Sequence, residues 1–142
     1  MMPIEIEKFS TVLQSALKNG LVCFEDCDIE LDFEPIVVYR KLRKSAIQED
    51  DFKSQAELMG EGKLNKWPNI GGENCIGNYS CSFFSNFSQL KSCFSSKRNY
   101  SFAKGNLMSV HGVIRRGEKT HIDCWVYQDS NIKECFEVYN EG

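Results

Sequence analysis

The final forty or so residues of the chain constrain its fold more than any other feature. From Ser101 onward, strand-like runs follow one another as SFAKGNLMSVHGVIRR, THIDCWVYQ and KECFEVYN. In these runs, apolar residues alternate with polar ones, or β-branched and aromatic residues gather, as is typical of strands. Short turn-like segments separate them, and strands joined by short connections pair antiparallel. We therefore expect a largely antiparallel sheet.

Earlier segments add helices and further strands. Helical spacing of apolar residues is present in IEKFSTVLQSALKNG, where an Asn-Gly pair predicts the end of the helix, in EDDFKSQAELMG and in SNFSQLKSCFSS. Strands are predicted for DIELDF, PIVVYRKL and NYSCSFF. The order helix, strands, helix, strand, helix, strands indicates the α+β class, with two or three short helices.

Length and composition indicate one soluble folded unit. A chain of 142 residues is the size of one ordinary domain, and its 42% apolar and 26% charged residues are near the average for globular proteins. We expect a single domain spanning residues 1–142. The N-terminal residues lack the pattern of a signal peptide and no run is long enough to span a membrane, so we expect a cytoplasmic protein without membrane contact.

The seven cysteines are expected to be free thiols, because their number is odd and export signals are missing. Cys23 and Cys27 have a spacing that suits zinc, but no comparable second pair follows them, so we expect no metal. A net charge of −3 with scattered basic residues argues against a nucleic-acid binder. No cofactor fingerprint is present, and the glycines of GGENCIG do not lie between a strand and a helix.

One segment, residues 60–79, is rich in glycine and asparagine and contains a proline and Trp67. Glycine accepts positive φ and proline removes a backbone donor, so we expect a long surface loop. Loops of this length are often functional. The loop, with Trp67, is therefore a candidate contact for a partner.

The segment GEK at 117–119 lies between two strand-like runs and predicts a hairpin. With a three-residue loop, Arg116 faces Thr120, and pairing continues to Val110 opposite Val126. Alternate residues then form two faces. The apolar face contains Val110, Gly112, Ile114, Ile122, Cys124 and Val126. The mixed face contains Ser109, His111, Val113, Arg115, His121, Asp123, Trp125 and Tyr127.

The mixed face has two interpretations. A sheet with helices on one side and water on the other gives this division without any function. Alternatively, the mixed face binds a partner, because aromatic, arginine and histidine side chains combine apolar area with directed hydrogen bonds. The candidate contacts there are His111, Arg115, His121, Asp123, Trp125 and Tyr127. His121 beside Asp123 is also a candidate general base, although no nucleophile accompanies it and Cys124 lies on the apolar face.

A second functional hypothesis comes from Arg40 in VVYRKL, Ser80 and Ser82 in YSCSFF, and Glu137 in CFEVYN. These segments resemble ADP-ribosyltransferases of the arginine-serine-glutamate type, although Cys81 replaces the family's middle threonine. The resemblance implies NAD as cofactor and a catalytic set of Arg40, Ser80, Ser82 and Glu137. Arginine would hold the dinucleotide phosphates, serine would orient the ribose, and the carboxylate would stabilise an oxocarbenium ion. Without this function, the same residues are ordinary surface positions of strands.

The sequence thus leads to a primary hypothesis and an alternative. The primary hypothesis is a small cytoplasmic domain that binds a macromolecule, expected to be another protein rather than nucleic acid, and that needs no cofactor. Its contacts would be the mixed face and the loop at 60–79. The alternative is an NAD-using transferase. The sequence leaves open the oligomeric state and whether Arg40, Ser80 and Glu137 share a cleft.

Overall fold

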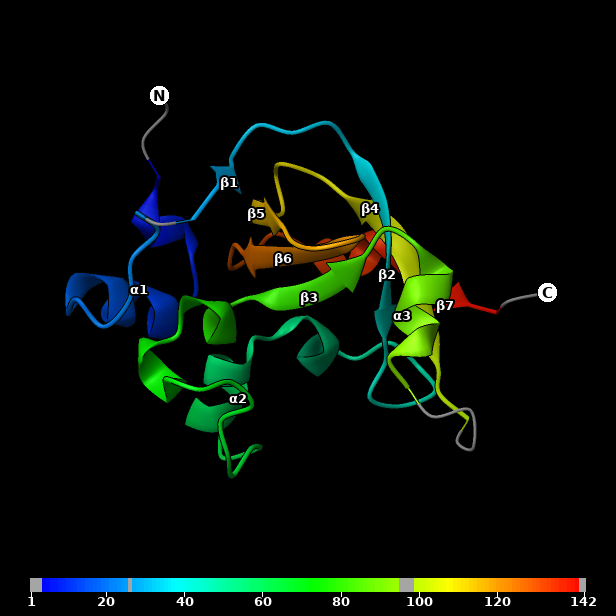
Figure 1. Ribbon diagram of the computed structural model, residues 1–142, viewed down its shortest axis with the longest axis horizontal. Coiled ribbons are helices and arrows are strands. Elements are labelled where there is room, and N and C mark those ends of the chain that lie inside the picture. Colours follow the sequence, from blue (N-terminus) through cyan, green and yellow to red (C-terminus); the bar gives the residue numbers. More distant parts are fainter. Residues whose placement is uncertain (1–3, 26, 95–98, 141–142) are drawn as a thin grey trace.

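The computed structural model describes residues 4–25, 27–94 and 99–140 (Figure 1). Its α-helices are α1 (Thr11–Lys18), α2 (Gln55–Gly60) and α3 (Phe87–Ser92). Its strands are β1 (Ile29–Glu30), β2 (Ile36–Lys41), β3 (Cys81–Phe84), β4 (Phe102–Leu107), β5 (Gly112–Arg116), β6 (His121–Val126) and β7 (Phe136–Tyr139). Short 3-10 helices are η1 (Ile6–Lys8), η2 (Glu49–Phe52), η3 (Gly72–Asn74), η4 (Ile76–Tyr79) and η5 (Ile132–Cys135).

The strands form one antiparallel sheet in the order β1-β5-β6-β3-β2-β4-β7. The predicted α+β class with an antiparallel sheet is therefore confirmed. The described pairing of β2 with β3 consists of Tyr39 opposite Phe84. In Figure 1, β3 and β6 run transversely to the direction of β2. The sheet therefore bends at the contact between β2 and β3, where its two halves meet.

The main core lies on the apolar face of the sheet. Its buried residues come from strands in both halves and from the segments that cover them: Phe33, Val38, Leu42, Phe52, Cys81, Phe83, Ala103, Leu107, Ile114, Ile122, Cys124, Ile132 and Phe136. Burying aliphatic and aromatic side chains stabilises the fold by about 1.5–3 kcal/mol each. This core fixes the bend of the sheet, because both halves contribute to it.

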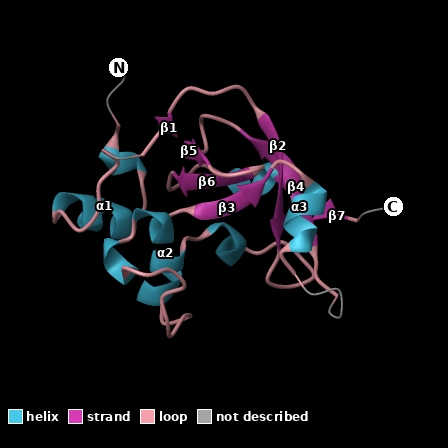
Figure 2. Ribbon diagram, viewed as in Figure 1, coloured by secondary structure: helices cyan, strands magenta, loops and turns pink. Residues whose placement is uncertain are grey.

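A second core covers the mixed face of β5 and β6. Its buried residues are Phe9, Leu13, Ala16, Val22, Ala56, Tyr79, Val113 and Trp125. In Figures 1 and 2, α1 and α2 gather at one end of the molecule, and α3 lies at the other. The sheet thus has apolar residues packed on both faces at the end where α1 and α2 lie.

Helix α1 begins later than its apolar spacing predicts. The Ser10 side chain accepts a hydrogen bond from the Leu13 amide, which caps the helix at that point. Phe9 instead forms an isolated β-bridge with Tyr127, and η1 precedes it. The predicted glycine end is found, since Gly20 has a φ of 73°.

The other predicted elements differ mainly in their bounds. The segment predicted as one helix at 49–60 is divided into η2 and α2, because Ser54 caps a new helix through a reciprocal bond with Glu57. The loop at 60–79 contains η3 and η4. The strand predicted at 28–33 is reduced to β1. The helix predicted at 85–96 is shorter as α3, and residues 95 and 96 lie outside the described residues.

The hairpin of β5 and β6 forms, but its predicted register is wrong by two residues. Ile114 lies opposite Cys124, and Arg115 lies opposite Asp123. The connection is longer than GEK because the Gly117 amide donates to the His121 carbonyl and Lys119 adopts a left-handed φ of 58°. A shift by an even number of positions keeps each strand residue on its predicted face. Val110 lies outside the strands and is exposed.

Candidate partner-binding site

The expectation that the mixed face is open to solvent is wrong at its centre. Trp125 is 0% exposed and His111 is 1% exposed. Phe24 packs edge-on against Trp125, and the Trp125 Nε1–H donates to the Ile76 carbonyl at 3.0 Å. The segment around α1 covers Trp125 because its own apolar side needs a surface to pack against, whereas the His111 ring contacts Met108 and Cys135. Trp125 and His111 therefore cannot contact a partner in this conformation.

Arg115 and Asp123 form a partly buried ion pair beside Trp125. Arg115 Nη2 and Nε donate to Asp123 Oδ2 at 2.8 and 3.2 Å, and the guanidinium lies 5.1 Å from the Trp125 ring centroid. Arg115 Nη1 also donates to the Cys27 sulfur at 3.3 Å. Both charges are thus satisfied within the domain. We interpret this pair as a link between β5, β6 and the segment before β1.

His121 is the accessible histidine, with a side chain 31% exposed and Nε2 3.7 Å from Asp123 Oδ1. Asp123 Oδ1 is also 3.5 Å from the Ser80 hydroxyl, which donates to the Gly77 carbonyl at 2.9 Å. Ser80 is buried. A general base acts on a proton within hydrogen-bond reach of the bound substrate. The Ser80 hydroxyl is buried and donates to a backbone carbonyl, so it is not placed to act on a substrate as a nucleophile with His121 as its base.

His111 and Cys135 form a second pair of chemically active groups. His111 Nδ1 accepts from the Met108 amide at 3.0 Å, and Nε2 lies 3.4 Å from the Cys135 sulfur. Because Nδ1 is an acceptor, the ring hydrogen is on Nε2 and points at the sulfur. An imidazole in this tautomer cannot accept the thiol proton while it keeps the bond from Met108. We therefore interpret the pair as a contact that holds the turn before β5 against η5, and not as a nucleophile with its general base.

Of the arginine and serines implied by the transferase resemblance, Arg40 lies on β2, Ser82 lies on the adjacent β3, and Ser80 directly precedes β3. The arginine side chain and the serine hydroxyls point to opposite sides of the sheet. Arg40 donates through Nε to the Asp51 carbonyl and through Nη1 to the Ser82 carbonyl. Its guanidinium lies 5.4 Å from the Phe83 ring centroid, on the apolar face. Ser82 alternates with Phe83, so its hydroxyl is on the opposite side of β3, as is that of Ser80.

Glu137 lies apart from these residues. It is on β7, and β4 separates β7 from β2. Glu137 is opposite Lys104, and Lys104 is opposite Tyr39, so these three share one side of the sheet. Arg40 follows Tyr39 and therefore points to the other side. The structure does not bring Arg40, Ser80 and Glu137 into one cleft.

An open apolar groove lies between α1 and α2, with a volume of about 540 Å³. Ala16 and Ala56, both 3% exposed, form its floor. Residues lining it are Thr11, Val12, Ser15, Ala16, Leu21, Ala56, Met59, Gly60, Trp67, Glu73 and Tyr79. The small side chains of Ala16 and Ala56 leave room between the two helices. Trp67, the candidate contact in the predicted loop, lines this groove.

The loop that forms one wall is held in place by its own contacts. The Tyr79 hydroxyl donates to the Glu73 carbonyl at 2.7 Å. The Asn78 side chain accepts from Asn69 Nδ2 at 2.8 Å and donates to the Gly72 carbonyl at 3.0 Å. Gly72 has a φ of 51°, and an added Cβ would lie 3.1 Å from the Trp67 ring. Glycine at this position therefore lets the backbone turn beside the indole. The wall carrying Trp67 is thus preformed.

Ile70, in the same loop, is fully exposed at 102% of its reference area. Leu21, which lines the groove, is 36% exposed. Scattered exposed apolar residues are common on proteins, but a fully exposed isoleucine in a loop that also contributes Trp67 to an apolar groove is typical of an interaction surface. Sequence reasoning identified the loop and Trp67 but not the groove, because α1 and α2 are far apart in the sequence.

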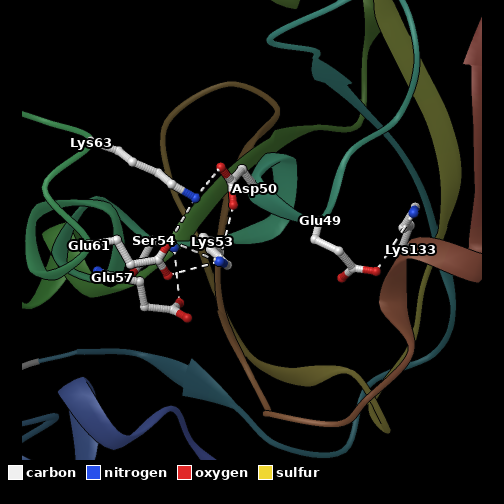
Figure 3. Close-up of polar contacts among 8 residues, drawn as sticks. All are labelled: Glu49, Asp50, Lys53, Ser54, Glu57, Glu61, Lys63 and Lys133. Atoms are coloured by element: carbon white, nitrogen blue, oxygen red, sulfur yellow. Dashed lines mark hydrogen bonds and ion pairs between the residues drawn. The ribbon is translucent and has the colours of Figure 1, made fainter.

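A second hollow, of about 460 Å³, is polar and includes Glu49, Lys53, Glu57 and Lys133 in its lining. Figure 3 shows that these charges are engaged with neighbours. Lys53 contacts Asp50 and Glu61 at 3.1 and 2.8 Å, and Lys133 is 3.7 Å from Glu49. The Glu57 carboxylate accepts from the Ser54 amide. Paired charges suit a role in linking η2, α2 and η5 more than recognition of a charged ligand.

The same network involves Lys63, which contacts Asp50 at 2.7 Å and Glu61 at 2.8 Å (Figure 3). Hydrogen bonds from Lys63 and Lys53 hold the pKa of Asp50 below its ordinary value. Such exposed ion pairs contribute little to stability, typically about 0–1 kcal/mol each. The positive and negative charges of this network thus balance one another at the surface near α2.

All seven cysteines are free thiols. Cys81 and Cys124 are buried in the main core, where desolvation raises the pKa of the Cys81 thiol to about 11.

Among residues 4–25, 27–94 and 99–140, there is no cluster of three or more His, Cys, Asp or Glu side chains that could bind a metal ion. Over these residues, every helix is too short or too polar to cross a membrane.

The fold and the groove define a small α+β protein with a bent, seven-stranded antiparallel sheet and an apolar cleft between two short helices. Comparison with known proteins gives no match to a family model, a curated protein or a solved structure.

Proposed function

We propose that this domain binds another protein, and that the binding site is the groove between α1 and α2 together with the loop at 60–79. The observation that carries the proposal is the open groove of about 540 Å³ lined by Trp67, Met59 and Leu21. Fully exposed Ile70 in the loop adds apolar contact area. Partner surfaces are typically anchored by aromatic and long apolar side chains that enter such pockets.

The groove favours a partner that inserts an apolar side chain. Its open volume of about 540 Å³, lined by Ala16 and Ala56, is large enough for a side chain of a partner. The preformed loop wall reduces the conformational entropy lost on binding. Ordered polar groups at the rim, such as the Glu73 backbone, are already hydrogen-bonded. Apolar burial rather than charge is therefore expected to supply most of the affinity.

The NAD-using alternative receives less support from the geometry. It requires an arginine, a serine and a carboxylate to face one bound dinucleotide. Arg40 and Glu137 point to opposite sides of the sheet, and Arg40 already donates to two backbone carbonyls. We therefore retain the binding function, and move its site from the mixed face to the groove.

The proposal is tested with two matched substitutions of exposed apolar residues. Ile70→Lys alters the loop at 60–79, which is part of the proposed site, and Val110→Lys alters an exposed valine in the turn before β5, outside both that loop and the groove lining. Both should fold like wild type, because neither side chain is buried. Proteins captured by tagged wild type from its own cells are identified, purified and titrated against each variant.

We expect Ile70→Lys to weaken binding of the purified partner at least about tenfold, which corresponds to about 1.4 kcal/mol. Val110→Lys should bind like wild type. Equal binding by wild type and Ile70→Lys would contradict the proposed site.

A further inference from the structure

A second surface, at the end of the sheet away from α1 and α2, combines aromatic rings with lysines. We call it the aromatic–lysine face, and it consists of Tyr39, Lys41, Phe87, Phe94, Tyr100, Phe102, Lys104 and Tyr139. These residues come from β2, α3, β4, β7 and the segment before β4. In Figure 1, α3, β4 and β7 lie together at this end. The groove proposed for protein binding does not include any of them.

Each lysine on this face is placed against two rings. Lys104 Nζ lies 5.9 and 5.6 Å from the ring centroids of Tyr39 and Tyr139. Lys41 Nζ lies 5.5 and 5.1 Å from those of Phe94 and Tyr100. Such cation–π contacts at partly exposed sites are weak, about 0.5–1 kcal/mol each. A stronger ligand for the ammonium groups can therefore displace them.

These two lysines differ from those around α2 in whether a carboxylate forms an ion pair with them. Within the described residues, neither Lys41 nor Lys104 forms an ion pair. Glu137 on β7 lies opposite Lys104 on β4. Among the described residues, their side chains do not form an ion pair. Lys53 and Lys63 by contrast each contact two carboxylates (Figure 3). Lys41 and Lys104 thus have no carboxylate in ion-pair contact among the described residues, although Glu137 lies on the same side of the sheet.

The positions of the two lysines suit a linear anion. Lys41 is opposite Phe102 and Lys104 is opposite Tyr39, so the lysines are diagonal neighbours on one side of β2 and β4. Diagonal neighbours are roughly 7–8 Å apart. Tyr39, Tyr100 and Tyr139 are only partly buried, so parts of their rings remain accessible beside each ammonium group.

We propose that the aromatic–lysine face binds single-stranded nucleic acid. Lys41 and Lys104 would contact neighbouring phosphates, and the tyrosine rings that they now cover would stack with bases. Single-strand binding commonly combines a positively charged surface with aromatic stacking of this kind. The negative net charge of the chain, which argues against such a ligand, is a sum over the whole surface. Asp50 and Glu61 are paired with lysines around α2, and Glu137 is the acidic residue opposite Lys104 on this face. The inference is independent of the proposed protein-binding groove.

The test is titration of a fluorescently labelled oligothymidylate with wild type and single variants, followed by fluorescence anisotropy at several salt concentrations. Lys41→Ala and Lys104→Ala should each weaken binding several-fold and reduce the slope of log K against log salt by about 0.7. Lys63→Ala is the matched control, since it removes one lysine from the α2 network and should leave binding unchanged. Circular dichroism and thermal unfolding confirm that each variant is folded.

An abasic oligonucleotide of the same length separates stacking from simple charge attraction. We expect it to bind several-fold more weakly than oligothymidylate, and Tyr100→Leu to reduce that difference. The proposal is overturned by absence of binding at low salt, by equal weakening in Lys63→Ala, or by equal affinity for the abasic strand. Equal affinity would assign the face to polyanions in general.

Discussion

His111 illustrates how burial of one residue determines a property of the whole domain. It is 1% exposed, and burial lowers its pKa from the ordinary value of 6.5. The neutral imidazole is needed because Nδ1 accepts the Met108 amide hydrogen. The unfolded chain therefore binds a proton at His111 more readily than the folded domain does.

Because the unfolded chain binds this proton more readily, the free energy of unfolding is expected to fall as the pH falls. The contribution of His111 to the free energy of unfolding is complete above pH 6.5, its ordinary pKa, and is lost as the pH falls below that value toward the lowered pKa. The loss is at most about 1.4 kcal/mol per pH unit for one proton. Denaturant unfolding between pH 7.5 and 5 measures it.

The matched variant is His111→Asn, whose side-chain oxygen can accept the Met108 hydrogen but does not titrate. It should flatten the dependence in this range, while His121→Asn, at the more exposed histidine, should retain it. An unchanged dependence in His111→Asn would show that other groups are responsible.

Trp125 gives a second prediction for a single residue. Its side chain is fully buried and its Nε1–H donates to Ile76. Trp125→Ala should lower the free energy of unfolding by about 3–5 kcal/mol, because it removes buried contacts and leaves a cavity. Val110→Ala, at a residue that is 67% exposed, should change it by less than about 0.5 kcal/mol. Near-equal stability of the two variants would mean that the mixed face is open after all.

Two glycines determine how closely elements of the sheet approach one another. An added Cβ at Gly105 would overlap the Cys135 carbonyl oxygen and the Phe136 ring, and one at Gly112 would overlap the Trp125 carbonyl oxygen. Gly105→Ala should therefore separate β4 from η5 and β7, and Gly112→Ala should separate β5 from β6.

We expect each of these substitutions to lower the free energy of unfolding by about 1–3 kcal/mol, the usual cost of overpacking. Gly60→Ala is the control, because nothing lies within 4 Å of its added Cβ. Thermal unfolding of the three variants compares their stabilities. A Gly105→Ala protein as stable as Gly60→Ala would contradict the close approach of η5 to β4.

The hairpin of β5 and β6 shows which features of a strand pair can be predicted from sequence. Strand alternation placed Ile114, Ile122 and Cys124 on one face correctly, because that assignment survives an even shift of register. The register itself was not predictable, since it depends on the left-handed Lys119 and the bond between Gly117 and His121. Local patterns therefore fix faces more reliably than pairings.

At the scale of the whole molecule, long-range packing decided what sequence patterns left open. The apolar spacing of α1 showed that it needs a surface, but not that this surface is the mixed face containing Trp125. The groove arises where α1 and α2 approach through Ala16 and Ala56, which are forty residues apart. An exposed loop with Trp67 was predicted from composition, and the groove beside it required the tertiary structure.

The central claim is that the groove and its loop are the surface that contacts a partner protein. Hydrogen–deuterium exchange of the domain with and without the captured partner tests it most directly. We predict that binding slows exchange in α1, in α2 and in the loop at 60–79, and leaves β4 and β7 unchanged. Slower exchange confined to β4, β7 and α3, with α1 and α2 unaffected, would contradict the claim.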